Sequence, residues 1–349
     1  MTQNGFLAAL VMSAVLILVM PVARAADKAF IWGVNGHPLA SYHGVTIEEQ
    51  VAALKTLGMQ SYRVDVQSIE QLPRLKELVN LADAGGVEVL PVFTPKIDLN
   101  AATIDEIYAT SRTLAYETVI MLGDQIKVWE LGNELENFAI IQPCEMRDDG
   151  TQYPCDWGPA GGLYPLDYYG PRWEKVAAVM QGLDAGMKQA GGDYRTAMGT
   201  AGWGHIGAFQ RMKQSGIEWD ISVWHLYGQD PEWAFKALAE YGKPIWITEF
   251  NHPKGSIESE AAQAEGLKGT MELIQRLRKL YPIEAAHIYE LMDETYWAPD
   301  FEAYMGLIRL DSDGENGWRS GRPKAAFKVV QDIIRQDQVK ESQSLGSAQ

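Results

Sequence analysis

One short stretch decides the fold that we expect of this chain: Ile126-Lys127-Val128-Trp129-Glu130-Leu131-Gly132-Asn133-Glu134. Its β-branched and aromatic residues form a mostly apolar run, which is typical of a parallel strand buried on both faces. Turn formers follow at Gly132 and Asn133, so the strand is expected to end there and to place Glu134 in a loop. A carboxylate fixed beside a rigid strand suits proton transfer, because its surroundings can raise its pKa.

A second stretch of the same kind also carries a carboxylate near its end: Pro244-Ile245-Trp246-Ile247-Thr248-Glu249-Phe250-Asn251. The chemistry of glycosidic bond cleavage requires a pair of carboxyl groups that flank the bond. Two carboxylates at the mouths of two parallel strands therefore suggest this reaction, with Glu134 and Glu249 as the pair.

The rest of the chain alternates between strand and helix patterns. The other predicted strands are Phe30–Asn35, Ser61–Val66, Val87–Phe93, Arg195–Thr200, Asp220–Tyr227 and Ala285–Leu291. The predicted helices are Thr46–Leu57, Ser68–Ala84, Thr103–Leu122, Pro171–Ala190, Ala208–Gln214, Pro231–Tyr241, Glu258–Leu280 and Lys324–Arg335. Eight strand–helix units predict a parallel sheet closed into a (β/α)8 TIM barrel, which typically needs about 250 residues. An open doubly wound sheet is the rival, but no Gly-x-Gly-x-x-Gly follows any predicted strand.

Length and charge narrow the class of partner. The chain has 349 residues, a formal net charge of −16 and a pI near 4.8. This acidic balance argues against nucleic acid and against anionic membrane surfaces as partners. A neutral or cationic polysaccharide or oligosaccharide fits it. The sequence does not predict an oligomeric state.

Both ends of the chain differ in composition from the predicted barrel. Residues 6–22 are apolar and precede Ala23-Arg24-Ala25, which is the pattern of a signal-peptide cleavage site. We therefore expect a signal peptide at residues 1–25 and a periplasmic or secreted protein. An uncleaved anchor is the alternative, since no Lys or Arg precedes the run. The barrel is expected to span residues 26–335 as a single domain, followed by a disordered polar tail at 336–349.

Two cysteines, Cys144 and Cys155, lie in the longest predicted loop, which runs from residue 135 to 169. An exported protein with two neighbouring cysteines most simply pairs them, so we expect a disulfide. Two cysteines cannot make a structural zinc site, and His205 and His252 show no metal-ligand spacing. We expect no metal and no cofactor.

These residues resemble clan A of the glycoside hydrolases. The resemblance rests on Gly-Asn-Glu at the end of the fourth strand and Glu249 at the end of the seventh. Further matching positions are Arg63, His225-Leu226-Tyr227 and Trp297. The stretch Thr200-Ala201-Gly202-Trp203 is most similar to family 39, with families 5 and 53 as near alternatives.

The resemblance implies that Glu134 is the acid/base and Glu249 the nucleophile of a retaining hydrolase. Glu134 must then start protonated, and the charge of Glu249 is expected to raise its pKa. Arg63, a permanent cation, could keep Glu249 ionised, and Tyr227 could donate a hydrogen bond to it. Asn133 is expected to hydrogen-bond the sugar 2-hydroxyl.

Other residues are weaker candidates. Glu290 and Asp293 are the rival carboxylates, although a substrate hydrogen bond suits them better than nucleophilic attack. His225 fits a substrate contact as well as a structural histidine. Aromatic side chains in loops after strands could stack on sugar rings, which have apolar faces: Trp203, Trp297 and Trp318.

Two other functions fit the same pattern. One is a barrel that binds glycans without cutting them, as an accessory to polysaccharide export. The other is a transglycosylase, in which a sugar rather than water completes the second step.

Overall fold

A computed structural model describes residues 29–42, 44–314 and 317–346, and it contains the expected (β/α)8 barrel. Eight parallel strands close in chain order, with β8 pairing with β1. The strands are β1 (Ile31–Gly36), β2 (Ser61–Val66), β3 (Glu88–Phe93), β4 (Val128–Leu131), β5 (Arg195–Thr200), β6 (Ile221–Leu226), β7 (Ile245–Phe250) and β8 (Ile283–Ile288).

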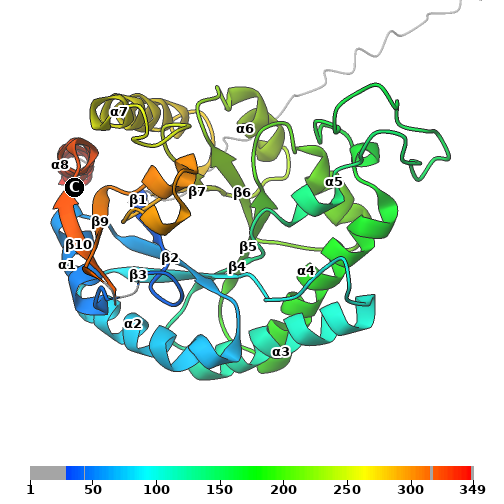
Figure 1. Ribbon diagram of the computed structural model, residues 1–349, viewed down its shortest axis with the longest axis horizontal. Coiled ribbons are helices and arrows are strands. Elements are labelled where there is room, and N and C mark those ends of the chain that lie inside the picture. The colour runs from blue at the N-terminus through cyan, green and yellow to red at the C-terminus, as the bar shows by residue number, and fades with distance from the viewer. Residues whose placement is uncertain (1–28, 43, 315–316, 347–349) are drawn as a thin grey trace, which may run out of the picture.

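The helices form a ring around the strands (Figure 1). They are α1 (Ile47–Leu57), α2 (Leu72–Ala84), α3 (Ile104–Leu122), α4 (Gly170–Ala190), α5 (Gly207–Gln214), α6 (Glu232–Ala239), α7 (Glu260–Leu277) and α8 (Ala325–Gly346). The start of α1 matches the sequence prediction, because Thr46 and Glu49 exchange the two hydrogen bonds of a capping box. Gly58 ends this helix at φ 79°, a left-handed conformation that glycine adopts without a Cβ clash.

The interior of the barrel changes character along its axis. Toward the amino ends of the strands it is filled by an apolar cluster of Leu90, Val128, Ala197, Ile221, Val223, Trp246 and Ala285. Toward the carboxyl ends it becomes polar, with buried Asn35, Arg63, Glu130, His225 and Thr248. A polar layer in a buried interior costs free energy unless its members are paired, so it marks the end of the barrel where chemistry is expected.

The carboxyl-terminal region differs from the sequence prediction. A two-stranded antiparallel sheet of β9 (Ile308–Ser312) and β10 (Trp318–Pro323) follows the eighth unit, and Trp318 lies in a strand rather than in a loop. The expected disordered tail at 336–349 is wrong for residues 336–346, because α8 continues to Gly346. Asp337 explains the extension: it is 3% exposed and accepts hydrogen bonds from Trp32 Nε1 at 2.9 Å and Arg278 at 2.8 Å.

The loop after β4 is held by the predicted disulfide, since Cys144 and Cys155 are bonded. Short 3-10 helices at Leu135–Ala139 and Pro165–Asp167 lie at the two ends of this loop. The expected signal peptide at residues 1–25 lies outside the described residues. Within the described part of the chain, no helix has the length and apolar character needed to cross a membrane.

Candidate active site

Glu134 and Glu249 converge at the carboxyl end of the barrel, as the sequence predicts. Glu134 lies just past β4, and Glu249 is the penultimate residue of β7. One oxygen of each carboxylate and a ring nitrogen of His225 all lie within 4.8 Å of one another. Retaining glycosidases place their two carboxyl groups about 5–5.5 Å apart, so the spacing suits a double displacement.

The backbone at Glu134 adopts an uncommon conformation. Its φ is +47°, in the left-handed region, and Gly132 two residues earlier is at +96°. A non-glycine residue in this region is strained by roughly 1–3 kcal/mol and persists only where its surroundings hold it. The strained turn directs the Glu134 side chain toward His225, whose Nδ1 lies 2.7 Å from Glu134 Oε1.

Arg63 on β2 links the two strand ends. Its Nε and one terminal nitrogen donate to both oxygens of buried Glu130 at 2.7 and 2.8 Å. The same terminal nitrogen donates to Asn133 Oδ1 at 2.7 Å, and the other donates to Glu249 Oε1 at 2.9 Å. Because Arg63 occupies the oxygen of Asn133, the amide nitrogen is the atom left to donate to a ligand.

Glu249 accepts a second hydrogen bond, from the Tyr227 hydroxyl at 2.8 Å on Oε2. The predicted contacts of Arg63 and Tyr227 with Glu249 are therefore both present. Charge-assisted hydrogen bonds of this kind stabilise the ionised carboxylate that a nucleophile must be. Burial and the charge of Glu249 raise the pKa of Tyr227 well above its ordinary value, so this hydroxyl remains a donor.

The placement of His225 corrects its predicted role as a substrate contact. It is 2% exposed, and both ring nitrogens contact protein groups: Nδ1 contacts Glu134, and Nε2 lies 3.1 Å from Thr248 Oγ1. It is therefore not placed to contact a substrate directly. Burial favours the neutral ring, but the charge of Glu249 and the bond with Glu134 outweigh burial and raise the pKa of His225.

The pKa of Glu134 shifts in the opposite direction to the one expected. Burial alone would raise it, but the hydrogen bond from His225 and the positive charges of His225 and Arg63 hold it below its ordinary value. The prediction that Glu249 raises the pKa of Glu134 missed the cation between them. Both shifts favour a proton on His225 and a negative charge on Glu134.

The two carboxylates open onto a cavity of about 540 Å³. Trp203 lines this cavity and is 57% exposed, so its indole is free to stack on a ligand. Trp297 is not among the residues that line the cavity; it lies in a 3-10 helix (Thr295–Trp297) beside Tyr296 and is 59% exposed. The aromatic wall at the β8 side is formed instead by Tyr289 and Phe301.

The rival carboxylates are set apart from this cavity. Glu290 is fully buried and accepts a hydrogen bond from the Tyr42 hydroxyl at 2.7 Å. Asp293 is 2% exposed and forms a close ion pair with Lys324. Neither is placed to attack a bound sugar, and burial raises the pKa of Glu290 well above its ordinary value.

Sequence reasoning missed several residues that hold the site. Asn35 donates to the carbonyls of Thr248 and Ile288 and accepts from Arg63 at 2.7 Å. Glu136 is fully buried and accepts from Ala201 N at 2.7 Å and His205 Nδ1 at 2.9 Å, which fixes the loop that carries Trp203. A polar residue inside an apolar strand pattern was the available signal for Asn35.

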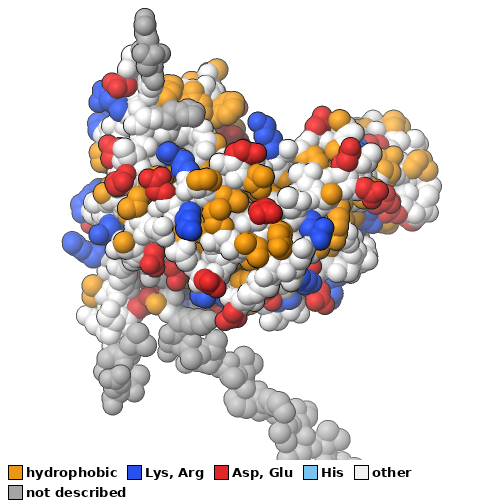
Figure 2. All heavy atoms as spheres, turned by 90° about the horizontal axis from the view of Figure 1, so that it is seen from below, with side chains coloured by type: hydrophobic (Ala, Val, Ile, Leu, Met, Phe, Trp, Pro, Cys, Tyr) orange, Lys and Arg blue, Asp and Glu red, His pale blue; other side chains and the backbone are white. Residues whose placement is uncertain are grey.

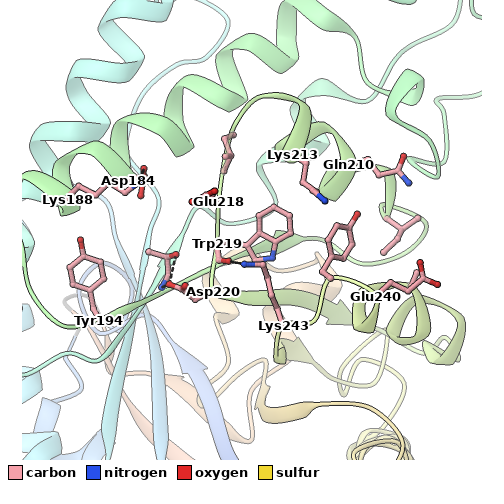
Figure 3. Close-up of a pocket in the computed structure, with 15 residues that line it drawn as sticks. Asp184, Lys188, Tyr194, Gln210, Lys213, Glu218, Trp219, Asp220, Glu240 and Lys243 are labelled. Atoms are coloured by element: carbon pink, nitrogen blue, oxygen red, sulfur yellow. Dashed lines mark hydrogen bonds and ion pairs between the residues drawn. The ribbon is translucent and has the colours of Figure 1, made fainter. Parts of the chain in front are cut away.

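A larger cavity, of about 710 Å³, lies elsewhere (Figure 3). Its residues come from the segments just before β5, β6 and β7, which is the end of the barrel opposite to Glu134 and Glu249. Its lysines already contact rings, with Lys243 lying 5.3 Å from the Trp219 ring centre and Lys213 lying 5.6 Å from that of Tyr241. Active sites of this fold occur at the other end, so size does not identify the site here.

Charge on the outer surface is mixed. On the face of the described residues seen in Figure 2, Lys and Arg side chains are interspersed with Asp and Glu side chains rather than gathered in one patch.

Comparisons with known proteins point to the same architecture. No family model matches the sequence, and no curated protein matches it. Solved structures do match it. A family 1 β-glucosidase from Thermotoga maritima in complex with isofagomine lactam is 14% identical, with a TM-score of 0.61 over 89% of this chain and 98% of that one.

Two further structures match at similar levels. The virulence factor SghA from Agrobacterium tumefaciens is 12% identical, with a TM-score of 0.63 over 88% of this chain and 96% of that one. The β-glycosidase BGL167 is 16% identical, with a TM-score of 0.62 over the same shares. The chain shares the fold of these proteins. The expected similarity to family 39 is not confirmed, since the matching structures include a family 1 enzyme.

Proposed function

We propose that this protein is a retaining glycoside hydrolase that acts on a polysaccharide or oligosaccharide. The observation that carries the proposal is the pair of facing carboxylates with different partners. Glu249 is held by a guanidinium and a phenol, whereas Glu134 contacts the imidazole of His225, whose pKa is raised. This asymmetry supports the proposed roles, with Glu249 as nucleophile and Glu134 as acid/base.

In the first step, a Glu249 oxygen attacks the anomeric carbon while the bond from that carbon to the leaving oxygen breaks. The proton for the leaving oxygen passes from His225 Nδ1 to Glu134 Oε1, 2.7 Å away, and from Glu134 to the leaving oxygen. As Glu249 becomes an ester it loses its negative charge, so the His225 cation loses one of the charges that retained its proton. The loss of the negative charge on Glu249 therefore favours transfer of the proton away from His225.

In the second step, water attacks the anomeric carbon and releases Glu249. Glu134 and neutral His225 take the proton of that water, which restores the starting state. Two displacements at one carbon retain its configuration. If a sugar replaced water, the same groups would carry out transglycosylation.

The positions of the two glutamates give the substrate a direction. The anomeric carbon must lie at Glu249 and the leaving oxygen at Glu134, so the leaving-group chain runs past Glu134 toward Trp203. The glycone lies on the side of Tyr289 and Phe301, which line the same cavity. An exposed indole at the leaving-group side suits a substrate longer than one sugar. We also propose that the protein is exported, as its first residues suggest.

The proposal is tested by trapping the intermediate. A 2-deoxy-2-fluoro glycoside with a dinitrophenolate leaving group forms the glycosyl-enzyme quickly and hydrolyses it slowly. We expect one sugar per chain, and peptide mapping is expected to place it on Glu249. A panel of such glycosides also identifies the glycone. A label on Glu290 or Asp293 would overturn the assignment, and no label with any glycone would favour a binding-only barrel.

A further inference from the structure

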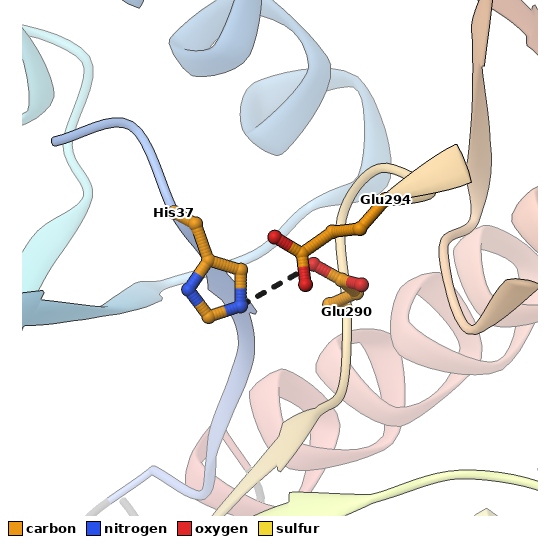
Figure 4. A group of neighbouring side chains, drawn as sticks. All are labelled: His37, Glu290 and Glu294. Carbon is orange, nitrogen blue, oxygen red and sulfur yellow. Dashed lines mark ion pairs between the residues drawn. The ribbon is translucent and has the colours of Figure 1, made fainter. Parts of the chain in front are cut away.

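A second cluster of one histidine and two glutamates lies at the same end of the barrel (Figure 4). His37 follows β1, and Glu290 and Glu294 follow β8. One ligand atom from each of the three lies within 4.8 Å of the others. Figure 4 shows the imidazole and the two carboxylates directed toward one another.

Two atoms of this cluster lack hydrogen bonds although they are buried. They are Glu290 Oε1 and His37 Nε2, and Glu290 itself is 0% exposed. A buried carboxylate oxygen without a donor is costly, so such a group in a native structure calls for a partner. His37 Nε2 lies toward the Glu290 carboxylate, whose Oε2 is the oxygen near it, so a cation between the two residues would give both a partner.

The groups behind the cluster hold it in a ligating orientation. Asp65 Oδ2 lies 2.7 Å from His37 Nδ1, which leaves Nε2 toward the glutamates. The Tyr42 hydroxyl donates to Glu290, and the Tyr296 hydroxyl donates to Glu294. A histidine whose second nitrogen bonds a carboxylate, together with hydrogen-bonded ligand carboxylates, is the usual outer shell of a transition-metal site.

The distance between His37 and Glu290 suits a small ion that both residues bind. His37 Nε2 lies 3.4 Å from Glu290 Oε2, which is long for a hydrogen bond. Two ligands of a tetrahedral Zn²⁺, each about 2.1 Å from the metal, are about 3.4 Å apart. One imidazole with two carboxylates is also a ligand set that zinc accepts, whereas calcium prefers six to eight oxygens.

We propose that His37, Glu290 and Glu294 form a binding site for a divalent transition ion, with Zn²⁺ as the ion that the geometry fits best. This differs from the sequence expectation that no metal is bound. The inference does not depend on the proposed hydrolase activity. The fourth coordination position of a tetrahedral ion would be filled by water. His37 and Asp65 line the catalytic cavity, which would give water and the ion a path to the site.

The position indicates what the ion would do. The first and last strands of the barrel pair with each other, with Ile31 opposite Ala285. An ion bound by His37 from one side and by Glu290 and Glu294 from the other would link the two strand ends where the barrel closes. It would also fix the glycone wall of the cavity, which contains His37 and Tyr289.

The test is equilibrium dialysis of the full chain against ZnCl2, after EDTA treatment, with zinc counted by mass spectrometry. We expect about one Zn²⁺ per chain. His37→Gln and Glu294→Gln are each expected to weaken binding at least ~100-fold. Asp65→Asn keeps all three proposed ligands and changes the hydrogen bond that orients His37, so it is expected to weaken binding ~10–100-fold. Co²⁺ in place of Zn²⁺ should give visible absorption bands that His37→Gln abolishes.

The matched control is the catalytic cluster, which has the same composition. Glu134→Gln and Glu249→Gln are expected to keep the zinc. Circular dichroism of each variant without metal separates loss of the site from loss of the fold. The proposal is overturned if the wild-type chain retains no zinc, if zinc survives both His37→Gln and Glu294→Gln, or if it is lost from the Glu134 and Glu249 variants instead.

Discussion

Two clusters at the mouth of the barrel contain the same residue types, one histidine and two glutamates within 4.8 Å, yet their surroundings differ. In the catalytic cluster, the oxygens of Glu249 accept from Arg63 and Tyr227, and those of Glu134 contact His225 and Asn137. In the other cluster, Glu290 Oε1 is buried without a donor.

Access differs as well. The Glu134 side chain is 31% exposed, whereas that of Glu290 is 0% exposed. A partnered carboxylate at the surface of a cavity can meet a substrate and exchange a proton. A sealed carboxylate with a free lone pair can meet only a small ion. The two clusters therefore have the same residue composition. They differ in the positive charge of Arg63 beside Glu249 and in the access of their carboxylates to the cavity.

The largest expected effect comes from exchanging one carboxylate in each cluster. Glu249→Gln removes the nucleophile and is expected to lower kcat at least ~10⁴-fold on both aryl glycosides and polysaccharide. Glu290→Gln keeps the acceptor for Tyr42 and is expected to cost less than ~10-fold. Initial rates on both substrates measure this difference. Equal losses in the two variants would contradict the separation of the clusters.

A smaller effect is expected from His225. Activity requires the proton held by His225 and Glu134, so it falls as pH rises through the raised pKa of His225, above pH 6.5. In His225→Asn the proton must lie on a carboxyl group, so the alkaline limb of kcat/KM is expected to move down by about 1–2 pH units. The rate at neutral pH then falls ~10–100-fold.

The matched control for this variant is His205→Asn, since His205 also pairs with a glutamate, Glu136, at 2.9 Å. Its alkaline limb is expected to stay in place. An unchanged limb in His225→Asn would show that the proton is held elsewhere.

The smallest effect compares two tryptophans of nearly equal exposure, one beside each cluster. Trp203 lines the cavity near Glu134, whereas the backbone N–H of Trp297 donates to the carbonyl of Glu294 at 2.8 Å. Trp203→Ala removes a stacking surface and is expected to lower kcat/KM on oligosaccharides ~2–10-fold. Trp297→Ala is expected to leave it unchanged. Kinetics on a chain-length series checks this, and a larger effect for Trp297 would reverse the proposed direction of the substrate.

The sequence predicts the barrel because each strand is a buried apolar run between helix signals. This pattern is local, so it can be recognised without knowing which residues are in contact. Strand ends on one edge of a barrel must meet, which predicts that Glu134 and Glu249 converge. Arg63 and Tyr227 were predicted from the resemblance to clan A, and their contacts with Glu249 are present.

The features that the sequence did not predict depend on contacts between elements that are far apart in the chain. The low pKa of Glu134 requires knowing that His225 on β6 lies between the two glutamates. The cluster of His37 with Glu290 joins the first and last strands, whose pairing is fixed only when the barrel closes. The helical tail was missed because its polar sequence hides one buried anchor, Asp337.

The most direct test of the central claim is the stereochemistry of the azide product from Glu134→Ala. This variant is expected to lose ~10²–10⁴-fold on natural substrates, which need the acid, and much less on a dinitrophenyl glycoside in the bond-breaking step. Azide needs no base, so it should release the sugar from Glu249 as a glycosyl azide of retained configuration. Proton NMR of the product distinguishes the outcomes. A retained azide is the result predicted here. An inverted azide from Glu134→Ala would contradict the assignment, because azide would then be replacing the nucleophile itself.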